Sequence, residues 1–417
     1  MLTTKKSSYK WVILVVCFFM EFICLGFCSS NAGMYLTAVT QALGFERSLY
    51  TLNTSFRHLA TILLSLCFGT MVKKYGTKKL ICLGLVALVA STLLYSFADK
   101  LYLFYLAGAL LGVGVIMTGS TMAGIVIRQW FDTDVGKYTG IAMAANGIGG
   151  AIAAQIISPI INNGDPFGYR DAYRLSAFIV LAFSVVILLF IKEPKDKTIP
   201  EKKAKTTSNW DGLEYDQLKK RNYFLLCAIM ILCNGLCLES ITHTGIAHMT
   251  DIGIDADFVA NIATVASLVL TGAKVLIGIV YDKKGLRFTL LGCHILMVIS
   301  FILILFANNT PFGRFSGMGA LVLSRLAQPL ETVMIPLICA DLFGSKAMLG
   351  ALGIFTAMKS IGSCIDAPLC NLVFDLTGTY IPVYIGFGLL TMAVAVGFQM
   401  VIKTVYKEKK QLIANQE

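Results

Sequence analysis

The fold is decided by residues 271–287, which read TGAKVLIGIVYDKKGLR. A single lysine, Lys274, interrupts the apolar part of this stretch. The apolar part then closes with two glycines and two charged residues at spacings of four, three and two, namely Gly278, Asp282, Gly285 and Arg287. A lysine inside an apolar run needs a partner or a cavity, and a turn with fixed spacing needs a structural reason.

The composition is that of a membrane protein. Of the 417 residues, 56% are hydrophobic and 14% are charged, with a mean hydropathy of +0.74, whereas a soluble domain carries about 25% charged residues. Twelve apolar runs of about 18 to 27 residues are present, and about 20 residues cross a bilayer as a helix. A transmembrane barrel would instead alternate polar and apolar residues. We therefore predict helical crossings near residues 11–36, 49–72, 80–97, 101–127, 136–160, 172–191, 223–247, 258–281, 288–307, 317–342, 348–374 and 380–402.

Positive charge is distributed unevenly between alternate loops. If the N-terminus is cytoplasmic, most of the 35 Lys and Arg residues fall in cytoplasmic tails and loops, as the positive-inside rule requires. We therefore expect a multi-pass protein of the cell membrane with both termini cytoplasmic and a first helix that is retained rather than cleaved. The net charge of +11 then indicates contact with the lipid bilayer rather than with nucleic acid. The twelve cysteines lie within or at the ends of apolar runs, so no disulfide framework, metal site or cofactor is expected.

The sequence contains an internal repeat. A polar, basic linker at residues 193–221 separates two halves, residues 1–192 and 222–417. A shift of about 209 residues places three first-half residues on three of the opening stretch: Gly69, Gly76 and Lys78 on Gly278, Gly285 and Arg287. The same shift aligns residues 24–28 with 233–237, and a shift of about 213 residues aligns a glycine-rich segment around Asn146 with one around Lys359. The repeat predicts an all-α membrane protein with twelve transmembrane helices in two pseudo-symmetric six-helix bundles.

Two six-helix halves, each with a Gly-x-x-x-Asp-x-x-Gly-x-Arg/Lys loop after its second helix, resemble the major facilitator superfamily. In that family the loop latches the cytoplasmic side, so the resemblance implies gating roles for Gly69, Gly76, Gly278, Asp282, Gly285 and Arg287. The second copy is complete, whereas Lys73 replaces the aspartate of the first. A gating role is therefore expected chiefly of Asp282, and a solvated basic turn is the alternative for each copy.

A second motif narrows the resemblance. Trp130 and Phe131, followed by Gly136 and Gly140, are similar to a stretch of the monocarboxylate carriers and the oxalate/formate antiporters. In oxalate/formate carriers, cations of the eighth and eleventh helices hold the substrate. Lys274 and Lys359 match those positions, although those carriers have arginine at the first. The resemblance thus implies a carrier of small organic anions.

Charged residues inside the predicted spans point to the same substrate class. Each costs about 2.5 to 3.5 kcal/mol at mid-helix, so each needs a partner or a cavity. The cations are Arg57, Lys274, Arg325 and Lys359, and the acids are Glu21, Glu239, Glu331 and Asp366. The repeat places Ser65 and Asn146 opposite Lys274 and Lys359, so these cations belong to one half only. The expected substrate contacts are Lys274, Lys359, Asn146, Ser65, Arg325 and Tyr35, although structural ion pairs for the charged members and core packing for Tyr35 remain open.

Buried carboxyls are candidates for coupling transport to protons. Glu21 and Asp366 lie within spans, and Glu239 shares a helix face with His243 four residues later. A carboxyl in a low dielectric takes up a proton readily, so any of the three acids could carry one in symport. An exchanger of two anions needs no such group, and symport and antiport both remain open.

The sequence therefore predicts a secondary active transporter that moves a mono- or dicarboxylate by alternating access and functions as a monomer. The alternative is a proton-coupled exporter of apolar or cationic compounds that uses Glu21 and Asp366. A membrane receptor is disfavoured because no long soluble domain is present to carry a signal. An enzyme is not expected, because no nucleophile and base or metal-ligand spacing marks a catalytic site.

Overall fold

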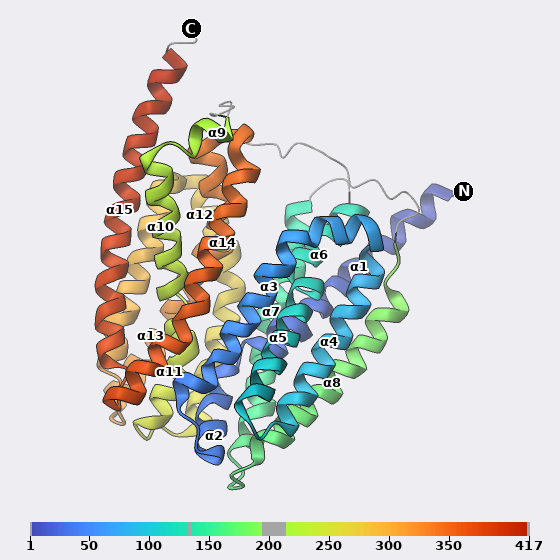
Figure 1. Ribbon diagram of the computed structural model, residues 1–417, viewed down its shortest axis with the longest axis vertical. Coiled ribbons are helices and arrows are strands. Elements are labelled where there is room, and N and C mark those ends of the chain that lie inside the picture. The colour runs from blue at the N-terminus through green and yellow to red at the C-terminus, as the bar shows by residue number, and fades with distance from the viewer. Residues whose placement is uncertain (1, 132–134, 194–213, 415–417) are drawn as a thin grey trace. The chain divides into compact units, whose positions relative to one another are not determined.

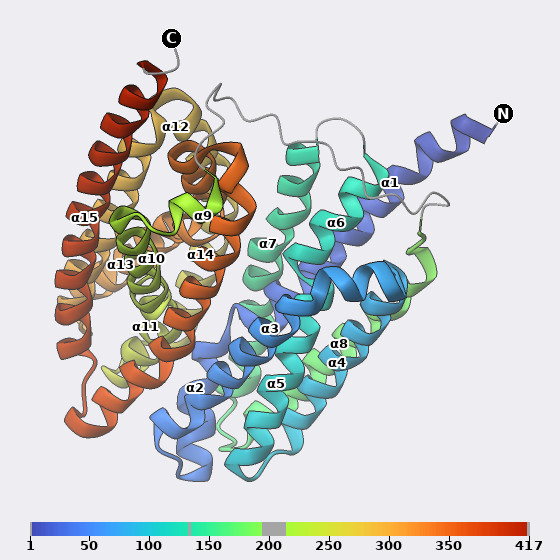
Figure 2. The same ribbon diagram turned by 45° about the horizontal axis from the view of Figure 1, so that its top comes forward.

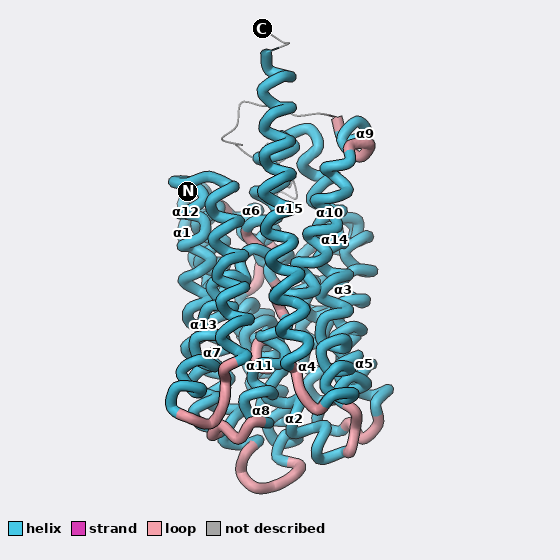
Figure 3. The backbone as a smooth tube through the Cα atoms, turned by 90° about the vertical axis from the view of Figure 1, so that its left-hand side faces the viewer, coloured by secondary structure: helices cyan, strands magenta, loops and turns pink. Residues whose placement is uncertain are grey.

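The structure is a computed structural model that describes residues 2–131, 135–193 and 214–414. Figure 3 traces this part of the chain, which consists of helices and loops without a strand. The helices follow from the composition, because an apolar segment in lipid must satisfy its backbone hydrogen bonds internally. The chain divides into two compact units, Met1–Lys202 with Met249–Gly272, and Lys203–His248 with Ala273–Glu417.

The first half of the sequence forms eight α-helices and one π-helix. Figure 2 shows α4 beside α5 and α8 in this unit. The elements are α1 (Leu2–Glu21), η1 (Phe22–Phe27), α2 (Ala32–Leu43), α3 (Arg47–Tyr75), α4 (Thr77–Phe97), α5 (Leu101–Thr118), α6 (Ser120–Trp130), α7 (Val135–Ile161) and α8 (Gly168–Phe190). The first predicted crossing is thus interrupted, because the wide π-helical turns of η1 follow directly after Glu21.

The second half contains two further interrupted crossings. Its elements are α9 (Tyr215–Leu218), α10 (Asn222–Cys237), α11 (Ser240–Asp251), α12 (Ala256–Leu305), α13 (Pro311–Ala327), η2 (Gln328–Glu331), α14 (Met334–Thr377) and α15 (Ile381–Ala414). A turn at Leu238 and Glu239 separates α10 from α11, and the 3₁₀-helix η2 separates α13 from α14. Figure 1 shows α10 running beside α14 and α15 in the second unit.

Two of the long helices each bend at a glycine. Gly285 in α12 and Gly344 in α14 adopt φ angles of 77° and 76°, which residues with a side chain rarely adopt. The predicted span at 258–281 and all but the last two residues of the span at 288–307 therefore lie within α12, on either side of Gly285. Among the described residues, eight helices are long and apolar enough to cross a membrane, or up to nine if the bent pair Pro311–Glu331 and Met334–Gly344 is one crossing.

The outer surface of α8 shows how the helices meet lipid. Large apolar side chains are exposed along it, including Phe178, Leu181, Val185 and Leu189. The hydroxyls of Ser176 and Ser184 are buried and donate to backbone carbonyls one turn earlier in the same helix. This pattern, apolar outside and polar inside, is the arrangement expected of a helix in a bilayer.

Glycines allow close helix crossings in both units, including one at positions that the repeat aligns. A Cβ atom built on Gly26 of η1 would lie 2.7 Å from Gly149 Cα of α7. In the second unit, a Cβ on Gly235 of α10 would lie 2.2 Å from the carbonyl oxygen of Lys359 on α14. Both distances are shorter than a Cβ contact tolerates, so only glycine permits these backbones to approach. The sequence shifts that align residue 26 with 235 and 146 with 359 therefore relate two copies of the same crossing.

Candidate functional site

The buried charges of the second unit meet where helices are interrupted. Glu239 lies in the turn between α10 and α11, and Glu331 is the last residue of η2. Lys359 lies on α14, at the close crossing with α10. Interrupted helices inside a membrane protein are tolerated where the protein covers them or where they line a cavity. In transporters of known structure such breaks often hold the substrate or the coupling ion.

Lys359 is held between two carboxylates. Its Nζ atom lies 3.2 Å from Glu239 Oε1 and 3.1 Å from Glu331 Oε2. The three side chains are largely buried, with exposed fractions of 17% for Lys359, 14% for Glu239 and 1% for Glu331. Glu331 Oε1 has no hydrogen-bond partner within the described residues. When all three groups are ionised, one buried ammonium faces two buried negative charges.

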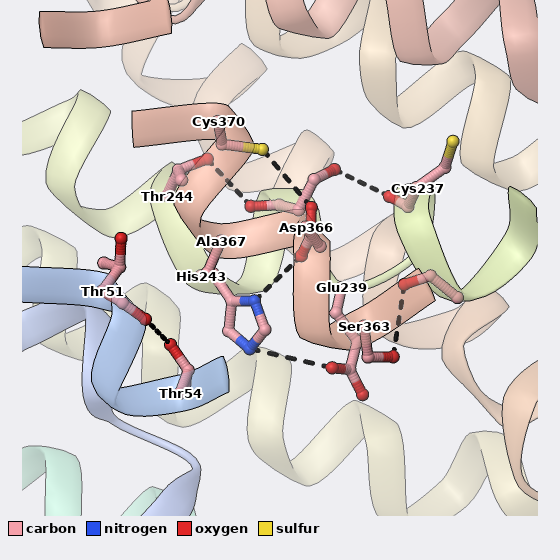
Figure 4. Close-up of polar contacts among 12 residues, drawn as sticks. Thr51, Thr54, Cys237, Glu239, His243, Thr244, Ser363, Asp366, Ala367 and Cys370 are labelled. Carbon is pink, nitrogen blue, oxygen red and sulfur yellow. Dashed lines mark hydrogen bonds and ion pairs between the residues drawn. The ribbon is translucent and has the colours of Figure 1, made fainter. Parts of the chain in front are cut away.

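His243 extends this arrangement to a third acid. Its Nδ1 atom lies 2.9 Å from Asp366 Oδ2, and its Nε2 atom lies 3.8 Å from Glu239 Oε2 (Figure 4). Asp366 is fully buried and also accepts a hydrogen bond of 3.3 Å from the Cys370 thiol. We call the five residues Glu239, His243, Glu331, Lys359 and Asp366 the charge cluster. It forms a continuous series of contacts from η2 through α14 and the α10–α11 turn to α11, and back to α14.

Arg325 adds a second cation near this cluster. Its side chain is buried in α13, and its Nη1 donates a 2.9 Å hydrogen bond to Gln328 Oε1. Its charge interacts with that of Glu239. Arg325 Nε lacks a hydrogen-bond partner among the residues described. The guanidinium thus satisfies part of its hydrogen bonding within its own turn, and both predicted roles, anion contact and structural pairing, stay open.

Lys274 and the first-unit candidates occupy different surroundings. Lys274 is half-buried on α12. Lys359, on α14, forms a group with its two ion-pair partners, Glu239 and Glu331. Ser65 is exposed on α3, and its hydroxyl donates 2.7 Å to the Ile62 carbonyl of its own helix. Their predicted roles as substrate ligands therefore rest on the sequence.

Two other first-unit candidates have side-chain neighbours. The Asn146 amide oxygen lies 3.1 Å from the hydroxyl of Ser30. Tyr35 is buried and stacks on Tyr173, with ring centroids 3.9 Å apart. Core packing thus accounts for the position of the Tyr35 ring.

The remaining first-unit charges lie at helix breaks or beside one another. Glu21 is fully buried at the end of α1, immediately before η1. Arg57 contacts the neighbouring His58, with 3.1 Å between Nη2 and Nε2. The position of Glu21 at a helix break resembles that of Glu239, and its role in proton coupling stays a prediction.

The loop of the second unit has a polar partner on the last helix. Arg287 Nε donates a 2.8 Å hydrogen bond to Gln399 Oε1 of α15, and Gln399 returns one of 3.2 Å to the Arg287 carbonyl. Asp282 is exposed. A Cβ on Gly278 or Gly285 would meet no atom within 4 Å, so the predicted gating role of these glycines does not depend on close packing in this conformation.

The loop of the first unit receives a carboxylate from the linker. Glu193 Oε1 accepts a 2.7 Å hydrogen bond from the backbone N–H of Lys78, in the first turn of α4. A Cβ on Gly76 would lie 2.5 Å from the same oxygen, and the φ angle of Gly76 is 81°. A carboxylate at a helix N-terminus is stabilised by the helix dipole and by unpaired N–H groups. Glu193 thus places a negative charge near the loop whose sequence carries Lys73 instead of aspartate, a contact that the sequence analysis missed.

The sequence analysis also missed the partner of Glu331. Pro329 stands two residues before it and has no backbone N–H to donate, so it favours the start, a kink or an interruption of a helix and was a signal for the η2 break. The break takes the carboxylate to Lys359 on another helix, and not to Arg325 on its own. No local pattern in the sequence specifies that contact.

Long apolar helices with a buried charge cluster at their breaks define a polytopic membrane transporter. A profile of the family described as Major Facilitator Superfamily matches residues 17–247 and 227–417, so the chain belongs to this family. The protein is therefore a multi-pass membrane transporter and not an enzyme.

The proteins that this chain resembles include transporters named for different substrates. The chain is 22% identical to Monocarboxylate transporter 12 of Homo sapiens over 79% of this chain and 69% of the relative. It is 30% identical to the Fujikurins efflux protein of Gibberella fujikuroi, over 32% of this chain and 28% of the relative. The solved structure of the nucleoside transporter NupG shares the fold, with a TM-score of 0.74 at 15% identity over 95% of this chain and 99% of that one.

Proposed function

We propose that the protein moves a small organic anion, a mono- or dicarboxylate, across the cell membrane by alternating access. The observation that carries the proposal is the Lys359 ammonium, which is largely buried at two helix breaks of the second unit. A buried ammonium is a strong ligand for a carboxylate, because the low dielectric strengthens their attraction. The similarity to a protein named as a monocarboxylate transporter supports the same substrate class.

Lys274 and Arg325 are proposed as further cations for the substrate. Both belong to the second half of the sequence, and Arg325 has a nitrogen without a hydrogen-bond partner in the described structure. Asn146, Ser65 and Tyr35 remain predicted polar contacts contributed by the first half. Asp282 remains the predicted cytoplasmic latch, with both chain termini cytoplasmic.

Purified protein in liposomes tests the anion proposal. Thermal-shift screening against acetate, lactate, pyruvate, oxalate, succinate and fumarate selects a carboxylate, and counterflow of its labelled form then measures translocation. We expect Lys359→Gln to reduce counterflow at least about tenfold, because a lost charge-assisted contact is worth roughly 1.5 to 3 kcal/mol. Lys274→Gln is expected to weaken transport as well.

Lys403→Gln provides the matched control, because Lys403 is an exposed lysine on α15 of the same unit. This variant should transport like the wild type. Undiminished counterflow in both Lys359→Gln and Lys274→Gln would refute the assignment of these lysines as ligands.

The second candidate is a proton-coupled exporter of apolar or cationic compounds. The similarity of one third of the chain to a fungal efflux protein favours it, and the excess of acids over lysines in the charge cluster is compatible with a cationic substrate. Competition separates the two functions. Inhibition of counterflow by small carboxylates supports the first, whereas transport inhibited only by lipophilic cations would replace it with the second.

A further inference from the structure

Building on the proposed anion transport, we propose that Glu331 must take up a proton before a substrate carboxylate can bind Lys359, so that one proton accompanies each carboxylate. Glu331 then alternates with the substrate as the partner of the same ammonium. The inference rests on the geometry around Lys359 Nζ, which is already in contact with two carboxylates.

Adding a substrate to the cluster in its present form would be unfavourable. A substrate carboxylate at Lys359 would place a third negative charge around one ammonium, in a site where the side chains are largely buried. Unbalanced buried charge is costly, because the surrounding low dielectric neither screens nor solvates it well. One carboxylate therefore has to lose its charge when the substrate arrives.

Glu331 is the acid that fits this role better. Its side chain is 1% exposed, its ionic contact is Lys359, and its Oε1 has no hydrogen-bond partner in the described part of the chain. Glu239 is 14% exposed and has a further neighbour in His243, whose Nε2 lies 3.8 Å from Glu239 Oε2, and the charge of Arg325 also acts on it. Loss of Lys359 thus leaves Glu239 beside His243, whereas Glu331 would lose its ion pair and stay beside the like charge of Glu239 unless it took up a proton.

The charges of Lys359 and Glu239 act directly on Glu331. The charged and titratable groups in and around the cluster come from several helices. They are Lys359 and Asp366 on α14, Glu239 in the α10–α11 turn, Cys237 at the end of α10, His243 on α11 and Arg325 on α13. With neutral His243 and Cys237, the ionised acids outnumber the two cations by one. A bound monocarboxylate adds one negative charge and the proton on Glu331 removes one, so the loaded cluster keeps the charge of the empty cluster.

The exchange is balanced in protons and charge. A hydronium ion on the open side of the membrane gives up one proton and becomes water, an O–H bond forms on Glu331, and the ion pair between Glu331 and Lys359 is lost. The substrate carboxylate then forms a new ion pair with Lys359. On the other side the substrate leaves, Glu331 releases its proton, and the original ion pair forms again.

Binding measured against pH tests the proposal with the carboxylate selected by the thermal-shift panel. In the wild type, uptake of one proton predicts that the Kd for this carboxylate rises about tenfold for each unit of pH across the range in which Glu331 is ionised in the empty site. Glu331→Gln carries no ionisable group at this position and resembles the protonated state. We expect its Kd to change less than about threefold over the same range.

Transport in liposomes provides the second measurement. For Glu331→Gln the readout is accumulation relative to counterflow in the same liposomes, because exchange of labelled for unlabelled substrate needs no net proton movement. Accumulation driven by a pH gradient should fall at least about tenfold. Glu408→Gln serves as the matched control, because it removes another acid of the second unit, which pairs with Arg221 at 3.0 Å outside the cluster. It should behave as the wild type in both assays.

Three results would overturn the assignment of Glu331. They are a wild-type Kd that is independent of pH despite carboxylate counterflow, accumulation by folded Glu331→Gln in a pH gradient, and loss of the pH dependence in Glu239→Gln. The last comparison keeps the proposal testable even if Glu331→Gln does not fold. Absence of wild-type counterflow with every carboxylate of the panel would instead refute the proposed function itself.

Discussion

The two units contain the same helix crossing, but they place different chemistry on it. In the first unit, Ser30 and Asn146 meet at 3.1 Å and carry no charge. The repeat aligns these positions with Glu239 and Lys359, which meet at 3.2 Å as an ion pair in the second unit. The close backbone crossing is thus present in both units. Its ionisable side chains, Glu239 and Lys359, belong to the second unit.

The loops after the second predicted helix of each half differ in the opposite way, because here the acidic side chain belongs to the first unit. In the first unit a carboxylate, Glu193, binds the N-terminus of α4 through Lys78 N. In the second unit a neutral amide, Gln399, binds Arg287. At these loops the carboxylate contact therefore belongs to the first unit, whereas at the crossings the ion pair belongs to the second unit.

The largest loss of stability is expected when Lys359, at the charged crossing, is replaced by asparagine, the residue at the aligned position 146 of the neutral crossing. Lys359→Asn should lower the free energy of unfolding by about 3 to 5 kcal/mol, because it leaves Glu239 and Glu331 without their shared cation. The double variant Glu239→Ser with Lys359→Asn, which copies Ser30 and Asn146, should recover part of that loss without restoring transport. Thermal unfolding in detergent measures both, with Lys403→Asn as a control.

A melting temperature for Lys359→Asn equal to that of the wild type would show that the ion pairs contribute little. In that case the contrast between the two crossings would concern transport alone and not stability.

The glycines at the crossings should give an intermediate effect of the same sign in both units. Gly26→Ala and Gly235→Ala each force a methyl group to within 2.7 Å or 2.2 Å of a neighbouring backbone atom. We expect a loss of about 1 to 3 kcal/mol from each, as for other overpacked sites. Gly353→Ala on α14 is the control, since its Cβ would meet nothing within 4 Å. Unchanged stability of Gly26→Ala together with a loss of stability in Gly235→Ala would show that only the crossing of the second unit has no room for a methyl group.

The smallest effect is expected at the two loops. Glu193→Ala should lower stability by about 1 kcal/mol or less, because it removes a charged partner from the N-terminus of α4. Gln399→Ala should have a comparable effect. Only the Glu193 effect should shrink in high salt, which screens exposed charges. Unfolding curves at low and high salt compare the two, and equal salt dependence would contradict the assignment of a charged contact to one loop and a neutral contact to the other.

The positions of the helices could be predicted from the sequence because hydropathy is a local property. The two apolar runs on either side of the loop motif predicted the two arms of α12, and the bend between them lies at Gly285 of that motif. Membership of the family followed from the same residues, since the loop motif and the repeat are visible without coordinates.

The contacts of the site were harder to predict because they join distant segments. Lys359 was identified as a buried cation, but its acids lie on other parts of the chain, one of them 120 residues away. Glu331 lies in the same predicted span as Arg325, whereas its ion-pair partner is Lys359 on α14. The single turn of η2 determines which helix the Glu331 side chain faces. Hydropathy does not specify the direction of a side chain at such an interruption.

The close approach of Gly235 to the Lys359 carbonyl also bears on the timing of transport. A methyl group on residue 235 would clash with the Lys359 carbonyl, so α10 and α14 are in direct backbone contact beside the ammonium. We expect a change of partner at the ammonium to proceed by rotation about side-chain bonds, which is faster than the microseconds to milliseconds of collective helix motions. Proton and anion would therefore reach equilibrium at Lys359 many times before the protein changes the side from which the site is open.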